Sequence, residues 1–320
     1  IPEAGVKMLR DKGYEVLINE RAKNRAADKE EILAGIKGAD AMLAILTDKI
    51  DAEIMDAGLS ASAGGPTLKV IANMAVGFDN IDLEAAKKRN IMVTNTPGVL
   101  TDTVAEHTFA LMLAISHRIV EADKFTRAGL YNAWGPMLLL GSDLFGKTLG
   151  VVGSGRIGSR MAYYAVKGFG MKVLYTDVKQ DESFEREFDA KFFNNIDDLL
   201  PKCDYVSLHV PLLESTRHLI NENRLKSMKK TAYLINTSRG PVIDEKALAR
   251  ALKEGWIRGA AIDVFENEPK VEPELLRQNN IILTPHIASA TEETRNAMAE
   301  LAAKNIIEAL EGRKPPNLIR

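Results

Sequence analysis

Three side chains that could bind and reduce a keto acid stand in the last third of the chain. Arg239 lies in the motif NTSRG, Glu268 in DVFENEP and His286 in LTPHIAS, and each motif follows a short apolar run that predicts a buried strand. Ligands of an open parallel sheet bind beyond the carboxyl ends of its strands, so we expect these groups to converge there. A guanidinium, a carboxylate and an imidazole are suited to moving a hydride and a proton onto a keto acid. The pattern favours a dehydrogenase.

Each of these side chains has an expected role. The guanidinium of Arg239 suits bidentate binding of a carboxylate and can polarise the adjacent carbonyl. His286 is the expected proton donor, and Glu268 is expected to bond one ring nitrogen, which fixes the tautomer and favours the protonated ring. Glu266 is either a rival partner or an exposed acid. Asp263 could accept from the nicotinamide carboxamide or cap a turn.

A glycine-rich turn upstream predicts a dinucleotide site. The motif GSGRIG follows the apolar run 149–152 and precedes a helical pattern over 157–169. Gly153 allows the tight turn, Gly155 lets the backbone approach a pyrophosphate, and Gly158 lets the helix pack close to the strand. The N–H groups and dipole at the helix N-terminus attract an anionic diphosphate.

Asp177 indicates which dinucleotide binds. It follows the next predicted strand, 172–176, and its carboxylate can accept from both adenosine ribose hydroxyls but would repel a 2′-phosphate. NAD is therefore expected rather than NADP. Lys179 either weakens this preference or is an exposed surface charge.

The composition limits the classes of function. The 320 residues suit two domains, and a formal charge of -2 gives no electrostatic case for nucleic acid or an anionic membrane. No apolar stretch is long enough to span a membrane, and no metal-ligand spacing such as HExxH occurs. Cys203 is the single cysteine, so we expect a reducing cytoplasm and a small buried side chain rather than a catalytic thiol.

Alternating helical and strand-like segments predict an α/β fold in two domains. A hinge is expected at 96–98, then one long helix over 101–128 with Asp102 as its cap, and a final amphipathic helix over 292–310 that returns to the first domain. Tyr14–Ile18 is a predicted strand, and a further strand is expected before Ile1. The other predicted strands are 41–46, 69–72, 91–94, 148–152, 172–176, 205–209, 232–236, 260–263 and 281–284.

Seven ordered motifs carry a resemblance that covers essentially the whole chain. They are VGFDNID (76–82), TNTPG (94–98), GKTLGVVGSGRIG (146–158), HVPL (209–212), NTSRG (236–240), DVFENEP (263–269) and TPH (284–286). In these motifs the chain resembles the D-isomer-specific 2-hydroxyacid dehydrogenases.

The resemblance implies a fold, domain bounds and an assembly. A Rossmann-type doubly wound parallel sheet at 97–288 binds NAD and is inserted into a smaller flavodoxin-like α/β substrate domain, residues 1–96 and 289–320, with the active site in the interdomain cleft. A segment at 101–145 is expected to form a homodimer.

The resemblance also implies site residues. Arg239, Glu268 and His286 fall on the family's catalytic positions. The substrate-binding positions are Val76, Gly77, Arg239 and Trp134, where Trp134 reaches a neighbouring subunit's site or serves only dimer packing. The cofactor-binding positions are Thr103, Gly153, Gly155, Arg156, Ile157, Gly158, Asp177, His209, Val210, Pro211, Thr216, Thr237, Ser238, Asp263, His286 and Ala288. Of the remaining histidines, His107 and His117 are expected to cap or pack and His218 to lie at the surface.

Within the family, Asn95–Thr101 and the Trp134 segment make the chain most similar to glyoxylate and hydroxypyruvate reductases. Some members of that branch have Ser-Arg where this chain has Thr176-Asp177, which disfavours NADPH here. Three alternatives stay open: a D-lactate dehydrogenase, a phosphite dehydrogenase, and a dinucleotide-sensing corepressor-like binding protein. Formate is disfavoured because formate enzymes resemble this pattern but carry glutamine at the position of Glu268.

Overall fold

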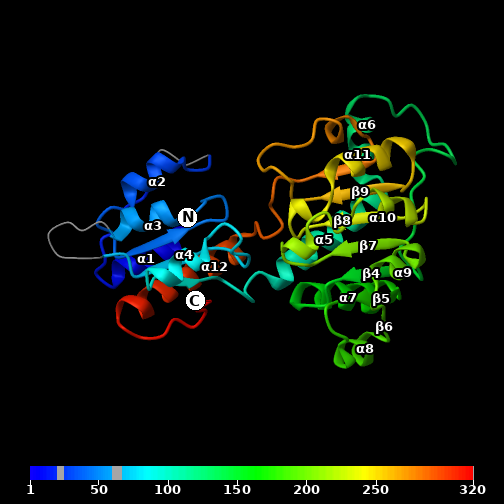
Figure 1. The fold of residues 1–320 in the computed structure, drawn as a ribbon. Coiled ribbons are helices and arrows are strands. Elements are labelled where there is room, and N and C mark those ends of the chain that lie inside the picture. The colour runs from blue at the N-terminus through cyan, green and yellow to red at the C-terminus, as the bar shows by residue number, and fades with distance from the viewer. Residues whose placement is uncertain (20–24, 60–66, 320) are drawn as a thin grey trace. The chain divides into compact units, whose positions relative to one another are not determined.

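The protein is described from a computed structural model that covers residues 1–19, 25–59 and 67–319. The chain divides into two compact units (Figure 1). The smaller unit comprises Ile1–Leu100 and Ala290–Arg320, and the larger unit is Thr101–Ser289. The larger unit is therefore an insertion in the sequence of the smaller one.

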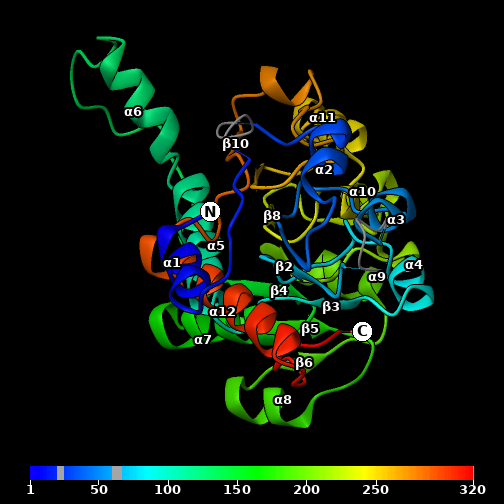
Figure 2. The ribbon, with the colours of Figure 1, turned by 90° about the vertical axis from the view of Figure 1, so that its left-hand side faces the viewer.

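The smaller unit is built on a three-stranded parallel sheet in the order β1-β2-β3. Its strands are β1 (Ala41–Ala44), β2 (Val70–Asn73) and β3 (Met92–Thr94). One apolar core joins the sheet to α2 (Lys29–Gly35), α3 (Ala52–Leu59) and α4 (Leu83–Lys88). The other helices are α1 (Glu3–Asp11) and α12 (Glu292–Leu310), which contact each other, and α12 also contacts all three strands (Figure 2).

The expected last helix is confirmed, because α12 covers 292–310 and packs in the smaller unit. The predicted strand at Tyr14–Ile18 is wrong. These residues are largely exposed and pair with none of the three strands, and the Tyr14 N–H donates instead to the Leu9 carbonyl of α1 at 3.3 Å.

The larger unit has a seven-stranded, fully parallel sheet in the order β10-β9-β8-β7-β4-β5-β6. Sequence order reverses between β4 and β7, which is the switch point of a doubly wound Rossmann sheet. The predicted fold class is confirmed. The strands are β4 (Thr148–Val152), β5 (Lys172–Thr176), β6 (Lys191–Phe192), β7 (Tyr205–Leu208), β8 (Tyr233–Asn236), β9 (Gly259–Ile262) and β10 (Ile281–Leu283).

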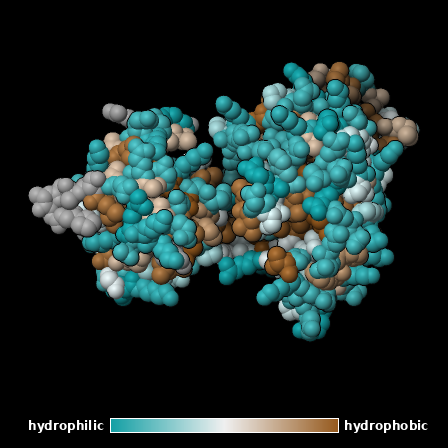
Figure 3. All heavy atoms as spheres, in the orientation of Figure 1, coloured by the Kyte–Doolittle hydropathy of each residue, from teal (hydrophilic) through white to brown (hydrophobic). Residues whose placement is uncertain are grey.

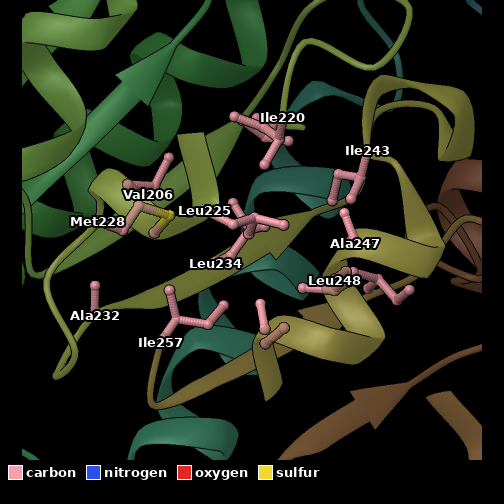
Figure 4. Packing of buried hydrophobic residues seen from close by; sticks show 14 of the residues in the cluster. Val206, Ile220, Leu225, Met228, Ala232, Leu234, Ile243, Ala247, Leu248 and Ile257 are labelled. Atoms are coloured by element: carbon pink, nitrogen blue, oxygen red, sulfur yellow. The ribbon is translucent and has the colours of Figure 1, made fainter. Parts of the chain in front are cut away.

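Helices cover both faces of this sheet. One face packs against α5 (Thr101–Ser116), α7 (Arg156–Phe169) and α8 (Glu182–Phe188). The other face packs against α9 (Ile196–Leu199), α10 (Glu222–Ser227) and α11 (Glu245–Glu254) (Figure 4). In α11 the side chain of Asp244 accepts from the Ala247 N–H, and Gly255 ends the helix in the left-handed conformation, as the sequence predicts.

The long helix expected over 101–128 is wrong in one respect. It breaks at Arg118, which adopts φ 54° and separates α5 from α6 (Ile119–Arg127). Asp102 does not cap α5 but lies in its first turn and pairs with Arg160 of α7. The segment from α6 to residue 140 projects from the body of the larger unit (Figure 2), and hydrophobic residues gather at its tip on the right of Figure 3.

Cys203 is fully buried in the apolar core that also contains Val206 and Leu234, and its thiol donates to the Leu199 carbonyl over 3.3 Å. Burial raises the pKa of the thiol to about 12. The expectation of a small buried side chain at Cys203 is confirmed.

Candidate active site

The candidate cofactor residues lie where parallel strands of the larger unit end. Gly153 follows β4, Asp177 follows β5, His209 follows β7, Thr237 follows β8 and Asp263 follows β9. In a parallel sheet the carboxyl ends of all strands lie on the same side, so these residues lie along one end of the sheet. The other cofactor positions within this unit are Thr103 in α5, Arg156, Ile157 and Gly158 in α7, Val210 and Pro211 after β7, Thr216 in a 3₁₀ turn, Ser238 after β8, and Ala288 after β10.

The glycine turn has the shape that a diphosphate needs. Gly153 has φ +95°, and a Cβ there would lie 2.7 Å from the carbonyl oxygen of His209. A Cβ on Gly158 would lie 2.0 Å from the Gly153 oxygen, so the start of α7 packs directly on the turn. A Cβ on Gly155 would meet no atom within 4 Å, and no side chain caps α7. The turn therefore presents helix N–H groups at an open position, which fits a dinucleotide diphosphate.

Asp177 is held beside this turn. Its Oδ2 accepts from the backbone N–H and the hydroxyl of Ser154 at 2.7 and 2.9 Å, and its Oδ1 accepts from the Val178 N–H at 2.6 Å. A fixed negative charge one residue beyond β5 suits ribose hydroxyls and opposes a phosphate.

His209 is neutral in the folded protein. Its Nε2 lies 2.9 Å from the hydroxyl of Ser207, and burial lowers the pKa of the ring to about 3. A neutral ring adds no positive charge to the cofactor edge, so any role of His209 there is contact rather than charge.

The turn that carries Arg239 is fixed by Asn236, which is 1% exposed at the end of β8. The Asn236 amide donates to the carbonyl of Arg239 at 2.9 Å, and its oxygen accepts from the N–H and hydroxyl of Ser238. The Arg239 guanidinium donates to the Ser238 carbonyl at 2.9 Å. A Cβ on Gly240 would lie 1.9 Å from the backbone carbon of Phe265, so this turn lies against the segment that leads to Glu268.

Glu268 and His286 are in contact. His286 Nδ1 lies 2.9 Å from Oε2 and 3.2 Å from Oε1 of Glu268, and both side chains are about a quarter exposed, at 23% and 26%. Glu268 Oε1 also accepts from the N–H of Phe265 at 3.0 Å. Because Nδ1 faces Glu268, Nε2 is the nitrogen that can donate a proton to a substrate.

Asp263 holds the backbone around His286. It is fully buried, and its carboxylate accepts from the Thr284 hydroxyl and from the N–H groups of Ile287 and Ala288. Although burial opposes ionisation, hydrogen bonds from His107, Thr284 and these N–H groups lower the pKa of Asp263. His286 has φ 55°, an uncommon conformation outside glycine, and its N–H donates to the Asp263 carbonyl at 2.8 Å. Of the two roles considered for Asp263, the structure shows the turn-holding one.

Glu266 and Glu245 lie beside the segment that carries Glu268. Glu266 is not an isolated surface acid, because its Oε1 lies 2.8 Å from Nε2 of His218 and its N–H donates to Glu245. Glu245 is 4% exposed in the first turn of α11, and burial raises its pKa. An acidic residue in a helix's first turn carries no sequence signal of burial.

The remaining candidates from the sequence lie in two other segments. Val76 and Gly77 follow β2 in the smaller unit, and Trp134 is 78% exposed in the projecting segment. Among the residues that the structure describes, no group of three or more His, Cys, Asp or Glu could hold a metal ion. Over the same residues, no helix is long and apolar enough to cross a membrane.

Comparisons with known proteins agree with a dinucleotide-binding Rossmann unit. The family "D-isomer specific 2-hydroxyacid dehydrogenase, NAD binding domain" matches residues 109–288. The chain is 52% identical to a glyoxylate reductase of Thermofilum pendens over 100% of this chain and 92% of the relative.

Two solved structures share the fold over the whole chain. The TT0316 protein from Thermus thermophilus is 42% identical with a TM-score of 0.90 and is covered over 97% of its length. D-lactate dehydrogenase from Aquifex aeolicus, solved with NAD and lactic acid, is 33% identical with a TM-score of 0.85 and is covered over 97% of its length.

This chain belongs to the D-isomer-specific 2-hydroxyacid dehydrogenases. It is therefore an oxidoreductase of the class that interconverts 2-keto and 2-hydroxy acids, with NAD as its cofactor. The predicted family and cofactor are confirmed.

Proposed function

We propose that this protein reduces a small 2-keto acid, glyoxylate or hydroxypyruvate first, to the 2-hydroxy acid, with D configuration where the product is chiral. The contact between His286 and Glu268 carries the proposal, because it provides an oriented proton donor after a strand end of the NAD-binding unit. The names of relatives such as the Thermofilum pendens enzyme support glyoxylate as the first substrate to test.

The roles of the residues follow from their chemistry. Bound NADH supplies the hydride. The guanidinium of Arg239 orients the substrate carboxylate and polarises the neighbouring carbonyl. His286 donates its Nε2 proton to the oxygen that becomes the hydroxyl, and Glu268 orients the ring through its contact with Nδ1. The N–H groups of Val76 and Gly77 in the smaller unit are proposed to bind the same carboxylate.

The assembly and domain roles belong to the same proposal. The larger unit holds the dinucleotide, and the smaller unit contributes the substrate loop. Two copies of the protein form a homodimer through the segment at 101–145. Its exposed apolar side chains support this, since Trp134 is 78% exposed and Met137 is 76% exposed. A Trp134→Ala variant separates the two roles of Trp134. If the side chain contacts a neighbouring subunit's substrate, KM rises. If it only packs in the dimer, the affinity between subunits falls and KM is unchanged.

A substrate panel tests the proposal. NADH oxidation is followed with glyoxylate, hydroxypyruvate and pyruvate, and NAD reduction is followed with D-lactate, phosphite and formate. The largest kcat/KM should be for glyoxylate or hydroxypyruvate. Tight NADH binding without turnover of any of these would instead support a dinucleotide sensor.

Replacing Asp177 by alanine should remove the preference for NADH. Losing a charge-assisted hydrogen bond to ribose costs about 1.5–3 kcal/mol, so the ratio of kcat/KM for NADH to that for NADPH should fall by about 10- to 100-fold. Steady-state kinetics with both cofactors measure this ratio. Asp198→Ala, which removes an exposed carboxylate from α9, is the matched control. A ratio unchanged in Asp177→Ala would contradict the assignment.

Replacing Glu268 by glutamine should lower kcat/KM for keto-acid reduction and leave the affinity for NADH unchanged. The carboxylate lies 2.9 Å from Nδ1 of His286 and orients the ring, so an amide in its place weakens the positioning of Nε2. Steady-state kinetics and titration of NADH check this. An unchanged kcat/KM would show that Glu268 does not act on the proton donor.

A further inference from the structure

The loop after β2 in the smaller unit is held by hydrogen bonds to its carbonyl groups. Four successive carbonyl oxygens accept hydrogen bonds from the same unit: Ala75 from the Thr96 N–H at 2.9 Å, Val76 from Asn95 Nδ2 at 2.8 Å, Gly77 from Asn73 Nδ2 at 2.9 Å, and Phe78 from the Ile81 N–H at 3.0 Å. Two of these four donors are side-chain amides. The loop's path therefore depends on side chains and not only on its own backbone.

In contrast to the carbonyl groups, two N–H groups of this loop are not hydrogen-bonded within the described residues. Within the ranges that the structure covers, the backbone N–H groups of Val76 and Gly77 have no hydrogen-bond acceptor. Val76 is 37% exposed, so these donors are not sealed in a core. Two successive N–H groups without an internal acceptor can donate hydrogen bonds to an anion.

A pair of asparagines ties this loop to a second one. Asn73 is fully buried, and its amide pairs with that of Asn80 in both directions, at 3.0 and 3.3 Å. Asn80 also donates to the carbonyls of Ile45 and Asp48, which follow β1, at 3.2 and 3.0 Å. The pair thus sets the spacing between the loops after β1 and β2.

A buried amide is costly unless its hydrogen bonds are satisfied, and the rest of β2 is fully buried and apolar. Asn73 meets this requirement only by bonding the loop and Asn80. Neutral amides also add no negative charge beside a site for a carboxylate, which a glutamate or aspartate at the same positions would do.

We propose that Asn73, Asn80 and Asn95 are positioning residues for the substrate carboxylate. Asn95 holds the Val76 carbonyl, whose peptide plane includes the Gly77 N–H, and so aims that N–H at the carboxylate of a 2-keto acid. Asn73 fixes the next carbonyl, and Asn80 sets how closely the loop after β1 approaches. This inference rests on the proposed function, because it assigns residues that support substrate binding in that reaction.

Asn95→Ala and Asn80→Ala are the test variants. Asn95→Ala removes one bond and leaves the backbone of residue 95 bonded to Asn305 and Asn317. Asn80→Ala removes the amide pair and both bonds to the loop after β1. Asn280→Ala is the matched control, because its amide also donates to two carbonyls, those of Leu252 and Arg258, at the other end of the strands in the larger unit.

We expect KM for the keto acid to rise about 3- to 10-fold in Asn95→Ala and about 10- to 100-fold in Asn80→Ala, because misdirected donors weaken carboxylate binding. The dissociation constant of NADH and the value of kcat should change less than about twofold, since neither the cofactor residues nor the proton donor is altered. Asn280→Ala should lower thermal stability without changing KM.

Calorimetric titration of oxalate provides a readout without turnover. Its affinity should fall in the two test variants by the same factors as KM rises, and should be unchanged in Asn280→Ala. Unchanged KM and oxalate affinity in Asn80→Ala would show that the amides are only structural. A wild-type protein that reduces no 2-keto acid but binds oxalate in an Asn80-dependent way would overturn the proposed function and retain the positioning role. A wild-type protein that does not bind oxalate would overturn the positioning role as well.

Discussion

Replacement of His286 by asparagine should lower kcat for keto-acid reduction by about 10²- to 10⁴-fold and leave NADH binding unchanged. General acid catalysis by a positioned side chain contributes about that factor, and an amide can donate a hydrogen bond but cannot transfer a proton. Asparagine is the suitable replacement because His286 has φ 55°, a conformation that asparagine tolerates better than most residues. Stopped-flow and steady-state rates at saturating NADH measure the loss.

His218→Asn is the matched control for this substitution. His218 also has a left-handed backbone, φ 49°, and also contacts a glutamate, at 2.8 Å from Glu266. The two substitutions therefore make the same local change, and only His286 is assigned the proton. A kcat in His286→Asn within a few-fold of the wild-type value would refute the assignment. Equal losses in both variants would point instead to a general effect of losing a histidine–glutamate pair.

Replacement of Gly240 by alanine should abolish most activity and destabilise the larger unit. The added Cβ would lie 1.9 Å from the Phe265 backbone carbon and 2.0 Å from its oxygen, and backbone cannot move aside as a flexible side chain can. Overpacking of this kind typically costs about 1–3 kcal/mol, and the shift would separate the turn of Arg239 from the segment that carries Glu268. Denaturant unfolding and kcat/KM report the two effects.

Gly168→Ala is the control, because this exposed glycine lies inside α7 and an added Cβ meets no atom within 4 Å. It should stabilise the protein by about 0.5–1 kcal/mol, since alanine is the better helix former. Normal stability and activity in Gly240→Ala would mean that the two segments are not packed as described.

The parts of the fold that depend on local pattern could be predicted from the sequence. Each strand of the Rossmann sheet longer than two residues is an apolar run ended by a small or polar residue, and α12 has its predicted bounds. The break between α5 and α6 could not be predicted, because it occurs at Arg118 without a glycine or proline to mark it. The strand β6 was missed because two residues are too short for a periodic pattern.

In the candidate site, too, only the residues that stand in a local sequence pattern could be predicted. Arg239, Glu268 and His286 are recognisable because each stands in a motif just after a strand, and the contact of Glu268 with His286 is the one the sequence suggested. Asn236, Glu245 and Asn80 are different. Their importance arises from contacts with backbone groups that the sequence does not pair, such as the N–H of Glu266 for Glu245 and the carbonyl of Ile45 for Asn80. No spacing rule in one sequence reveals such partners.

Because Cys203 is buried, labelling of its thiol can report the unfolding of the larger unit. A thiol that is 0% exposed, and whose pKa burial raises to about 12, offers a disulfide reagent neither access nor thiolate at neutral pH. Labelling can then occur only in molecules whose Rossmann core has come apart, and with one cysteine in the chain each labelling event has a single origin. In a pulse of the reagent, the rate at which the protein gains the mass of the label thus measures unfolding of the dinucleotide-binding unit. Unfolding of the smaller unit alone adds no mass, because Cys203 lies in the larger unit.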